Sequence, residues 1–162
     1  MMRLLFAVAV LFLSQTMSGQ NTISNLFREM PDSILPTLTR NNRLDMIDFM
    51  DARMQAEITN KLDGKSEMKA LTSDSLLLRM SASTDVTLLL LDVVEPVDSS
   101  LQVVCMVRTY RLASGQGEEH AFSYYSSSWR KLTEQPQLSE RSLARVRSYP
   151  PSTILNVFST EK

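Results

Sequence analysis

Two stretches near the middle of the chain are too apolar to form strands that expose one face to water. They read DVTLLLLDVV at residues 85–94 and LQVVCMVRTYRL at residues 101–112. A strand with one solvated face alternates apolar and polar residues, whereas a strand covered on both faces contains an almost continuous apolar run. The two stretches therefore predict neighbouring strands in a sheet that is covered over much of both faces near its middle.

Two more strands are expected beside this pair, at residues 75–81 (SLLLRMS) and 120–129 (HAFSYYSSSW). Turn-forming sequences separate the four stretches, among them EPVDSS and ASGQGEE, and such connections are typical of hairpins. Short connections between consecutive strands predict an antiparallel meander.

The segment before these strands is predicted to be helical. Residues 23–30 place their apolar side chains at the spacing of one helix face, and Pro31 ends the pattern. Residues 31–38 are expected to form a short helix or an irregular turn. The longest helix is predicted from about Asn42 to Thr59. Its apolar stripe consists of Leu44, Ile47, Met50, Met54 and Ile58.

The C-terminal part adds one helix and one strand to the expected fold. SERSLARVRS at residues 139–148 predicts a short basic helix with Ser139 as its N-cap, and TILNVF at 153–158 predicts a last strand. Together these elements predict an α+β fold, in which N-terminal helices pack on a four- or five-stranded antiparallel meander sheet.

The first residues have the layout of a secretory signal peptide. Arg3 provides the positive charge, residues 4–13 form an apolar run, and small residues follow at Ser18 and Gly19. A membrane-spanning helix needs roughly 20 apolar residues, so this run is too short to span. We therefore expect a cleaved leader at residues 1–19, a single domain at residues 20–162 without a membrane span, and a periplasmic or secreted location.

Composition excludes some classes of function and favours none. The chain has 17 basic and 18 acidic residues, which argues against a general nucleic-acid binder, because such proteins carry a basic excess. The single cysteine, Cys105, cannot form an internal disulfide, so stability is expected to come from a packed core.

Three phrases together resemble a known family. They are MPDSILPTLTRNNRLDMIDFMD (30–51), LTSDSLLLRMS (71–81) and VVCMVRTY (103–110), and they resemble short exported Bacteroidales proteins classed as a domain of unknown function. The resemblance implies an exported protein of a Gram-negative gut or oral bacterium, and it implies no activity. The order of helices and meander is also similar in architecture to small PepSY and β-lactamase-inhibitor-like domains.

Asp45, Asp48 and Asp51 recur at every third residue of the longest predicted helix. At helical spacing they form a sloping row rather than a cluster that converges on one ion. With Asn42 as the N-cap, Asp45 falls at the third helical position, where a carboxylate stabilises the helix start. A capping, solvated face is the main interpretation. Contact of Asp45 and Asp48 with a partner, or a metal-dependent enzyme site formed with His120, are the alternatives.

The two residue types most often used in catalysis, cysteine and histidine, each occur once in this sequence and outside any catalytic motif. Cys105 lies among valines and is expected to be a buried structural thiol. His120 is the only histidine, and the sequence contains no Gly-rich phosphate loop, HExxH or Cys-rich metal motif. Met46, Met50 and Met54 are expected to fill the core rather than to bind Cu(I). We therefore assign no catalytic residue, cofactor or metal ligand.

Tyr124, Tyr125 and Trp129 cluster in SYYSSSW. Consecutive residues of a strand point to opposite faces, so one tyrosine is expected in the core and the other on the surface, where it suits a partner. Packing of this edge strand against the C-terminal segment is an equally weighted alternative.

Two short sequences, DSI at 32–34 and DSL at 74–76, resemble the acceptor pattern for O-glycosylation of exported Bacteroidetes proteins. The resemblance implies glycans on Ser33 and Ser75. An Asp-Ser pair before an apolar run is also an ordinary cap or turn signal.

These observations predict an exported, non-enzymatic binding or adaptor module. Its partner is expected to be a protein, peptide or glycan of the cell envelope, and its oligomeric state stays open. The alternatives are a structural component of an envelope assembly and the metal-dependent enzyme considered above.

Overall fold

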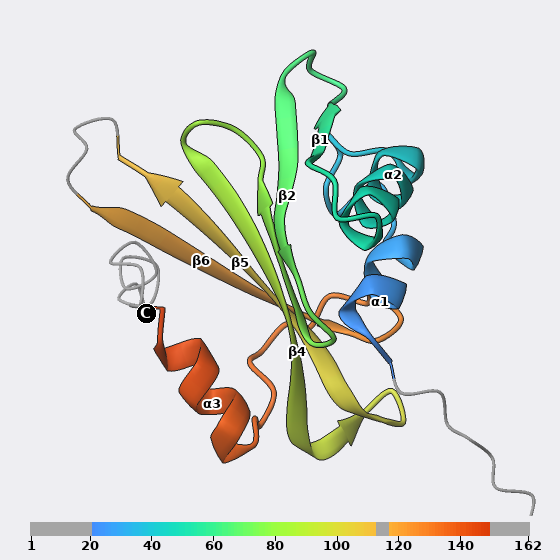
Figure 1. Cartoon of the computed structure of the whole chain (residues 1–162). Coiled ribbons are helices and arrows are strands. Elements are labelled where there is room, and N and C mark those ends of the chain that lie inside the picture. The colour runs from blue at the N-terminus through green and yellow to red at the C-terminus, as the bar shows by residue number, and fades with distance from the viewer. Residues whose placement is uncertain (1–20, 113–116, 150–162) are drawn as a thin grey trace, which may run out of the picture.

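The computed structural model describes residues 21–112 and 117–149, so the predicted leader and the predicted strand at 153–158 lie outside the described residues. This described part of the chain forms a six-stranded antiparallel sheet and three helices, which confirms the α+β class (Figure 1). The helices are α1 (Ile23–Glu29), α2 (Arg40–Asp51) and α3 (Glu140–Arg147). The strands are β1 (Ala56–Thr59), β2 (Lys65–Leu71), β3 (Ser75–Arg79), β4 (Thr84–Val97), β5 (Ser100–Arg111) and β6 (Glu118–Ser126).

The sheet is a meander, as predicted, because every strand pairs with its neighbour in the sequence, in the order β1-β2-β3-β4-β5-β6. It has six strands instead of the predicted four or five. The two additional strands are β1 and β2, and β2 contains none of the β-branched and aromatic residues that mark strands. In β2 the buried Ser66 and Met68 alternate with charged residues that keep contact with water.

The predicted helix at 42–59 is wrong in its second half. α2 ends at Asp51, Arg53 adopts a positive φ of 56°, and the chain continues as β1. Ile58 is buried as predicted, but as part of the strand alternation of β1, and Met54 is 58% exposed. Ile58 fits both the 3.6-residue spacing of the predicted helix and the two-residue alternation of the strand, so the helical pattern continued into β1 by chance.

Both faces of the central strands are covered, as the apolar runs predict. Even-numbered residues of β4 and β5, such as Leu88 and Met106, pack with α1 and α2, and we call this side the α1–α2 face. Odd-numbered residues, such as Leu91 and Cys105, pack with Leu138 and α3, and we call this side the α3 face. Figure 1 shows α1 and α2 on one side of the sheet and α3 on the other.

The prediction that the helices are N-terminal holds for α1 and α2 only. α3 follows the sheet in the sequence and begins at the predicted N-cap, Ser139, whose side chain accepts a hydrogen bond from the Ser142 N–H. α2 begins earlier than predicted. Thr39 is its N-cap and forms a capping box with Asn42, so Asp45 does not occupy the third helical position.

A buried arginine, which the sequence analysis missed, joins α1, the following turn and α2. Arg43 is 1% exposed, and its guanidinium donates to the carbonyl oxygens of Phe27 at 3.0 Å, of Leu38 at 3.1 Å and of Met30. It also donates to the carboxylate of Asp32 at 2.8 Å. These bonds give the Met30 and Leu38 carbonyls a donor and add a second donor to the Phe27 carbonyl, which also accepts from the Met30 N–H at 3.4 Å.

We expect Arg43→Met to lower the free energy of unfolding by about 3 kcal/mol or more, because the buried carbonyls lose their donors and Asp32 loses its partner. Urea unfolding, followed by the fluorescence of the only tryptophan, Trp129, measures the change. Arg40→Met is the matched control, because Arg40 is exposed and lies 3.7 Å from Glu29. It is expected to change stability by less than about 0.5 kcal/mol. Equal effects of the two substitutions would contradict the role given to Arg43.

Candidate binding groove

An open groove of about 600 Å³ lies on the α3 face, between β6, the segment 131–135 and α3. We call it the α3 groove. Half of its twelve lining residues are apolar or aromatic, and the other half include charged side chains of both signs at Lys131, Glu134 and Arg147. The apolar and aromatic lining residues are Phe122, Tyr124, Leu132, Leu143, Val146 and Tyr149. Volume and composition are those of many ligand sites.

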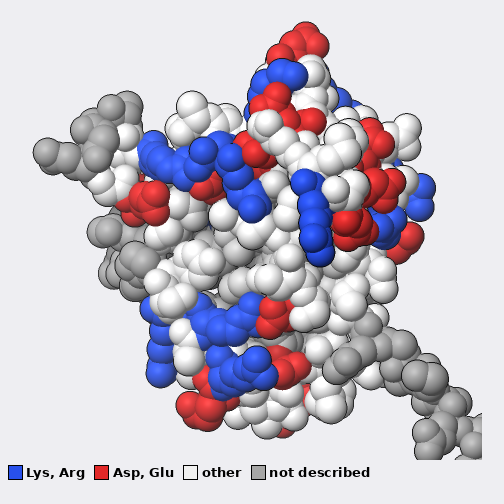
Figure 2. All heavy atoms as spheres, in the orientation of Figure 1, with Lys and Arg blue, Asp and Glu red and all other residues white. Residues whose placement is uncertain are grey.

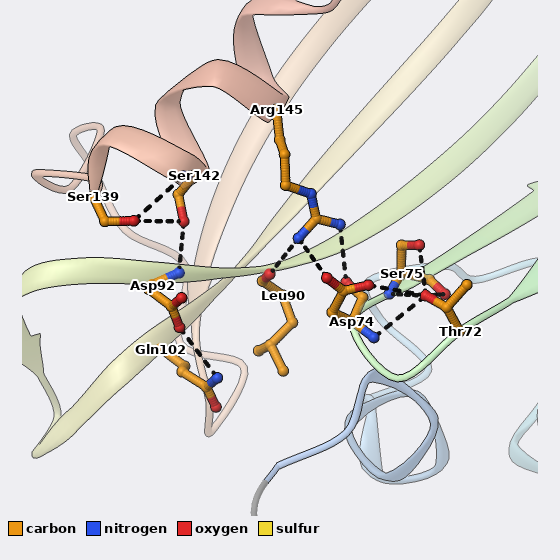
Figure 3. Close-up of polar contacts among 9 residues, drawn as sticks. All are labelled: Thr72, Asp74, Ser75, Leu90, Asp92, Gln102, Ser139, Ser142 and Arg145. Carbon is orange, nitrogen blue, oxygen red and sulfur yellow. Dashed lines mark hydrogen bonds and ion pairs between the residues drawn. The ribbon is translucent and has the colours of Figure 1, made fainter.

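Arg145 fastens α3, one wall of the groove, to the sheet (Figure 3). Its guanidinium donates to the carboxylate of Asp74 at 2.9 Å and to the carbonyl of Leu90 at 3.1 Å. One turn earlier, Ser142 accepts a hydrogen bond from the Asp92 N–H at 2.8 Å. A helix of eight residues is not stable alone, so these contacts and its apolar side position it. We call Asp74, Asp92, Ser142 and Arg145 the α3 latch.

The other wall of the groove is β6, an edge strand whose outer side is only partly paired. Near its end, Tyr124 C=O accepts from Leu132 N–H at 2.8 Å, and Ser126 N–H donates to Arg130 C=O at 2.9 Å. The pairing of β5 with β6 continues without a register shift, so the main-chain groups of every second residue point outward. His120 and Phe122 therefore also direct N–H and C=O groups outward, and no described strand pairs with them.

The three clustered aromatic side chains are all buried. Tyr124 is 8%, Tyr125 6% and Trp129 7% exposed, so the expectation that one tyrosine ring is exposed is wrong. Tyr125 and Trp129 belong to the core of the α1–α2 face, where Trp129 Nε1 donates to the Leu26 carbonyl at 2.9 Å. The cause is the segment after β6, which folds back along the strand. Of the three, only Tyr124 borders the α3 groove.

Cys105 lies opposite Tyr124 in the β5–β6 pair and is completely buried, as predicted. Burial raises the pKa of the Cys105 thiol to about 12, and the Tyr124 hydroxyl opposes this only in part. Burial also raises the pKa of Tyr124. Both groups are therefore neutral near pH 7, and the thiol lacks the thiolate character of a nucleophile.

The structure does not bring His120 to Asp45 and Asp48. The two aspartates are exposed on α2, which covers the α1–α2 face, whereas His120 is 5% exposed on the α3 face. The sheet separates them. His120 Nδ1 lies 2.9 Å from Thr109 Oγ1, and its ring contacts Tyr149 edge to face with a centroid distance of 5.6 Å.

The aspartate row on α2 pairs with a neighbouring helix. Arg28 of α1 lies 3.7 Å from Asp48 and 3.9 Å from Asp51. Within residues 21–112 and 117–149, no group of three or more His, Cys, Asp or Glu residues is placed to hold a metal ion. None of the helices described is both long and apolar enough to cross a membrane.

In both Asp-Ser pairs the aspartate has a structural role. Asp32 holds Arg43 and Asp74 holds Arg145. Ser33 is exposed in the irregular turn, whereas Ser75 begins β3 and its hydroxyl lies 2.8 Å from Thr72 Oγ1. Of the two predicted glycosylation sites, Ser33 is therefore the more accessible.

The sequence analysis missed the α3 groove. Its walls come together through the latch, which joins residues 71 positions apart in the sequence. One signal was available, because Leu143 and Val146 stand three residues apart on one side of an otherwise basic predicted helix.

Comparison with known proteins identifies a family and a fold. A family model described as "Protein of unknown function (DUF3256)" matches residues 14–153. No curated protein matches the chain. A solved structure, described as a domain of an uncharacterized protein from Porphyromonas gingivalis W83, has 23% sequence identity and a TM-score of 0.54. The similarity covers 70% of this chain and 57% of that chain, and at this identity it shows the fold alone.

The latch predicts a specific local effect. Arg145→Ala is expected to loosen α3, because the Asp74 carboxylate and the Leu90 carbonyl lose a charged donor. Arg145 and Asp74 are both partly exposed, so their ion pair contributes little. The expected loss is therefore about 1 kcal/mol, which corresponds to approximately fivefold faster amide exchange in α3. Exchange monitored by NMR checks this, with strands β4 and β5 as the internal reference. Arg141→Ala, on the same helix and exposed, is the control. Unchanged exchange in Arg145→Ala would show that α3 does not depend on the latch.

Proposed function

The chain belongs to the DUF3256 family, whose description assigns no activity, and we propose that it is an exported, non-enzymatic binding module of the cell envelope. In this proposal the ligand is an extended segment of an envelope protein. The segment lies in the α3 groove and adds as a strand to the outer edge of β6.

One observation carries the proposal, namely the outer edge of β6, with which no strand of residues 21–112 and 117–149 pairs and beside which the α3 groove lies. The outward N–H and C=O groups of His120 and Phe122 offer hydrogen bonds that another strand matches at the same spacing. Strand addition of this kind takes its affinity from main-chain bonds and its specificity from pockets for alternate side chains. In the α3 groove, Leu143 and Val146 would contact the side chains of the added peptide strand that point toward α3.

A peptide fits this site better than a glycan does. A glycan has no alternating main-chain donors and acceptors to match those at the outer edge of β6. The binding role is favoured over catalysis because the two most reactive side chains are engaged inside the fold. Cys105 is a buried neutral thiol, and the His120 imidazole is hydrogen-bonded to the Thr109 hydroxyl.

Export is part of the proposal and rests on the sequence. The leader-like arrangement of residues 1–19 supports it, and the single cysteine is compatible with an oxidising compartment, because no internal disulfide depends on it.

The test uses a peptide selected from a random heptapeptide phage library on the purified protein and then synthesised. Phe122→Pro removes the outward N–H of this residue and leaves the β5–β6 bonds in place, because proline is tolerated on the free side of an edge strand. We expect the substitution to weaken binding by at least ~10-fold, about 1.4 kcal/mol, as measured by isothermal titration calorimetry.

Phe122→Ala is the matched control, because it removes the same ring and keeps the N–H group. It is expected to weaken binding less than Phe122→Pro does, and the difference reports the main-chain contribution. Thermal melting verifies that both variants fold. The proposal fails if no peptide is enriched, or if the proline and alanine variants bind the selected peptide equally well.

We also propose that Ser33 carries an O-glycan in the exported protein, because it is exposed in an irregular turn. Intact mass of the protein isolated from its native host is expected to exceed the sequence mass by the mass of the glycan, and Ser33→Ala removes the excess. Ser75→Ala is expected to leave the excess in place, because the Ser75 hydroxyl is engaged with Thr72. An unmodified mass would exclude glycosylation at both sites.

A further inference from the structure

A second groove lies on the opposite side of the sheet, on the α1–α2 face. It has a volume of about 620 Å³ and lies beside the β1–β2 and β3–β4 hairpins and the turn that holds Leu35. We call it the Arg108 groove. Leu62 is 76% exposed and Tyr110 is 41% exposed, so both present apolar surface to a ligand at this groove. Its apolar lining consists of Leu35, Leu62, Met80, Val86 and Tyr110.

The charges of the Arg108 groove have one sign. Lys65 and Arg108 are the charged residues among those that line it. Lys65 Nζ lies 3.4 Å from the carboxylate of Glu57, so its charge has a partner. Arg108 donates to the Ile34 carbonyl at 3.2 Å and forms no ion pair with a described carboxylate. A guanidinium has five N–H donors, so most donors of Arg108 are left for another acceptor.

A half-buried guanidinium beside apolar walls favours a ligand of matching chemistry. A carboxylate is the planar acceptor that a guanidinium binds in a fork, and such charge-assisted bonds are stronger where water is partly excluded. An inorganic anion gains nothing from the apolar walls, and a neutral hydrocarbon gains nothing from Arg108. We propose that this groove binds a small aliphatic carboxylate, whose chain lies against the exposed side chains of Leu62 and Tyr110 and whose carboxylate pairs with Arg108.

This site is independent of the proposed peptide site. The Arg108 groove is on the α1–α2 face and the α3 groove is on the α3 face, so the sheet separates the two ligands. Binding at one groove is therefore measurable without the other, and failure of one proposal leaves the other intact.

The experiment compares octanoate with 1-octanol, which has the same chain and lacks the carboxylate. Binding to the purified protein is measured by NMR titration, with chemical-shift changes expected at Val86, Arg108 and Tyr110. Arg108→Gln is expected to weaken octanoate binding roughly ten- to hundredfold, the range for a hydrogen bond to a charged group, and to leave octanol binding unchanged.

Two further variants keep the test decisive. Arg130→Gln is the matched control, because Arg130 is exposed and pairs with Asp98 outside the groove at 2.7 Å. It is expected to leave octanoate binding unchanged. Leu62→Ser removes an exposed wall residue, so it does not threaten folding, and it is expected to weaken both ligands alike.

Three results would overturn the proposal. The first is equal affinity of the wild-type protein for octanoate and octanol, and the second is undiminished octanoate binding by Arg108→Gln. The third is a set of shift changes confined to the α3 groove.

Discussion

The architecture depends on one constraint, which is that β4 and β5 bury side chains on both faces. Neither strand is stable until two separate parts of the chain pack on its two apolar faces. The N-terminal helices cover one face and the segment that ends in α3 covers the other. Each cover contains a bonded arginine: Arg43 joins α1, the turn and α2 within the first cover, and Arg145 fastens α3 to the sheet. Their carboxylate partners, Asp32 and Asp74, each precede a serine and an apolar residue. Both covers thus contain a short helix whose arginine donates to main-chain carbonyls.

Incomplete cover is what leaves room for ligands. α3 is short and reaches only part of its face, so an apolar groove stays open between it and β6. The turn before α2 lies beside the β1–β2 and β3–β4 hairpins, and Val86 and Arg108 line a second groove there. In Figure 2 the visible surface carries acidic and basic residues side by side, with arginines gathered over α3. Specific recognition is therefore expected in these grooves rather than across a large field of one charge.

Local signals were sufficient for much of the fold. The apolar runs and turn sequences predict β3 to β6, their meander order and their two-sided burial, and Ser139 marks the start of α3. The failures have a common cause in tertiary context. Helical spacing continued by chance through Ile58 and concealed β1, and the polar composition of β2 concealed a strand that buries only alternate residues. Arg43 reads as a surface residue of a helix, and only the folded turn shows the carbonyls that it satisfies. One tyrosine of the aromatic cluster was predicted to be exposed, with packing of the strand as the alternative, because nothing local indicates that the chain folds back after β6.

The central functional claim is that β6 has a free outer edge to which another strand can add. Residue-resolved amide hydrogen exchange of the free protein tests this most directly, because inward and outward N–H groups alternate along one strand. The account predicts slow exchange at Ala121 and Ser123, which pair with β5, and fast exchange at His120 and Phe122. Equally slow exchange at all four positions would contradict the account, because the edge would then already be paired.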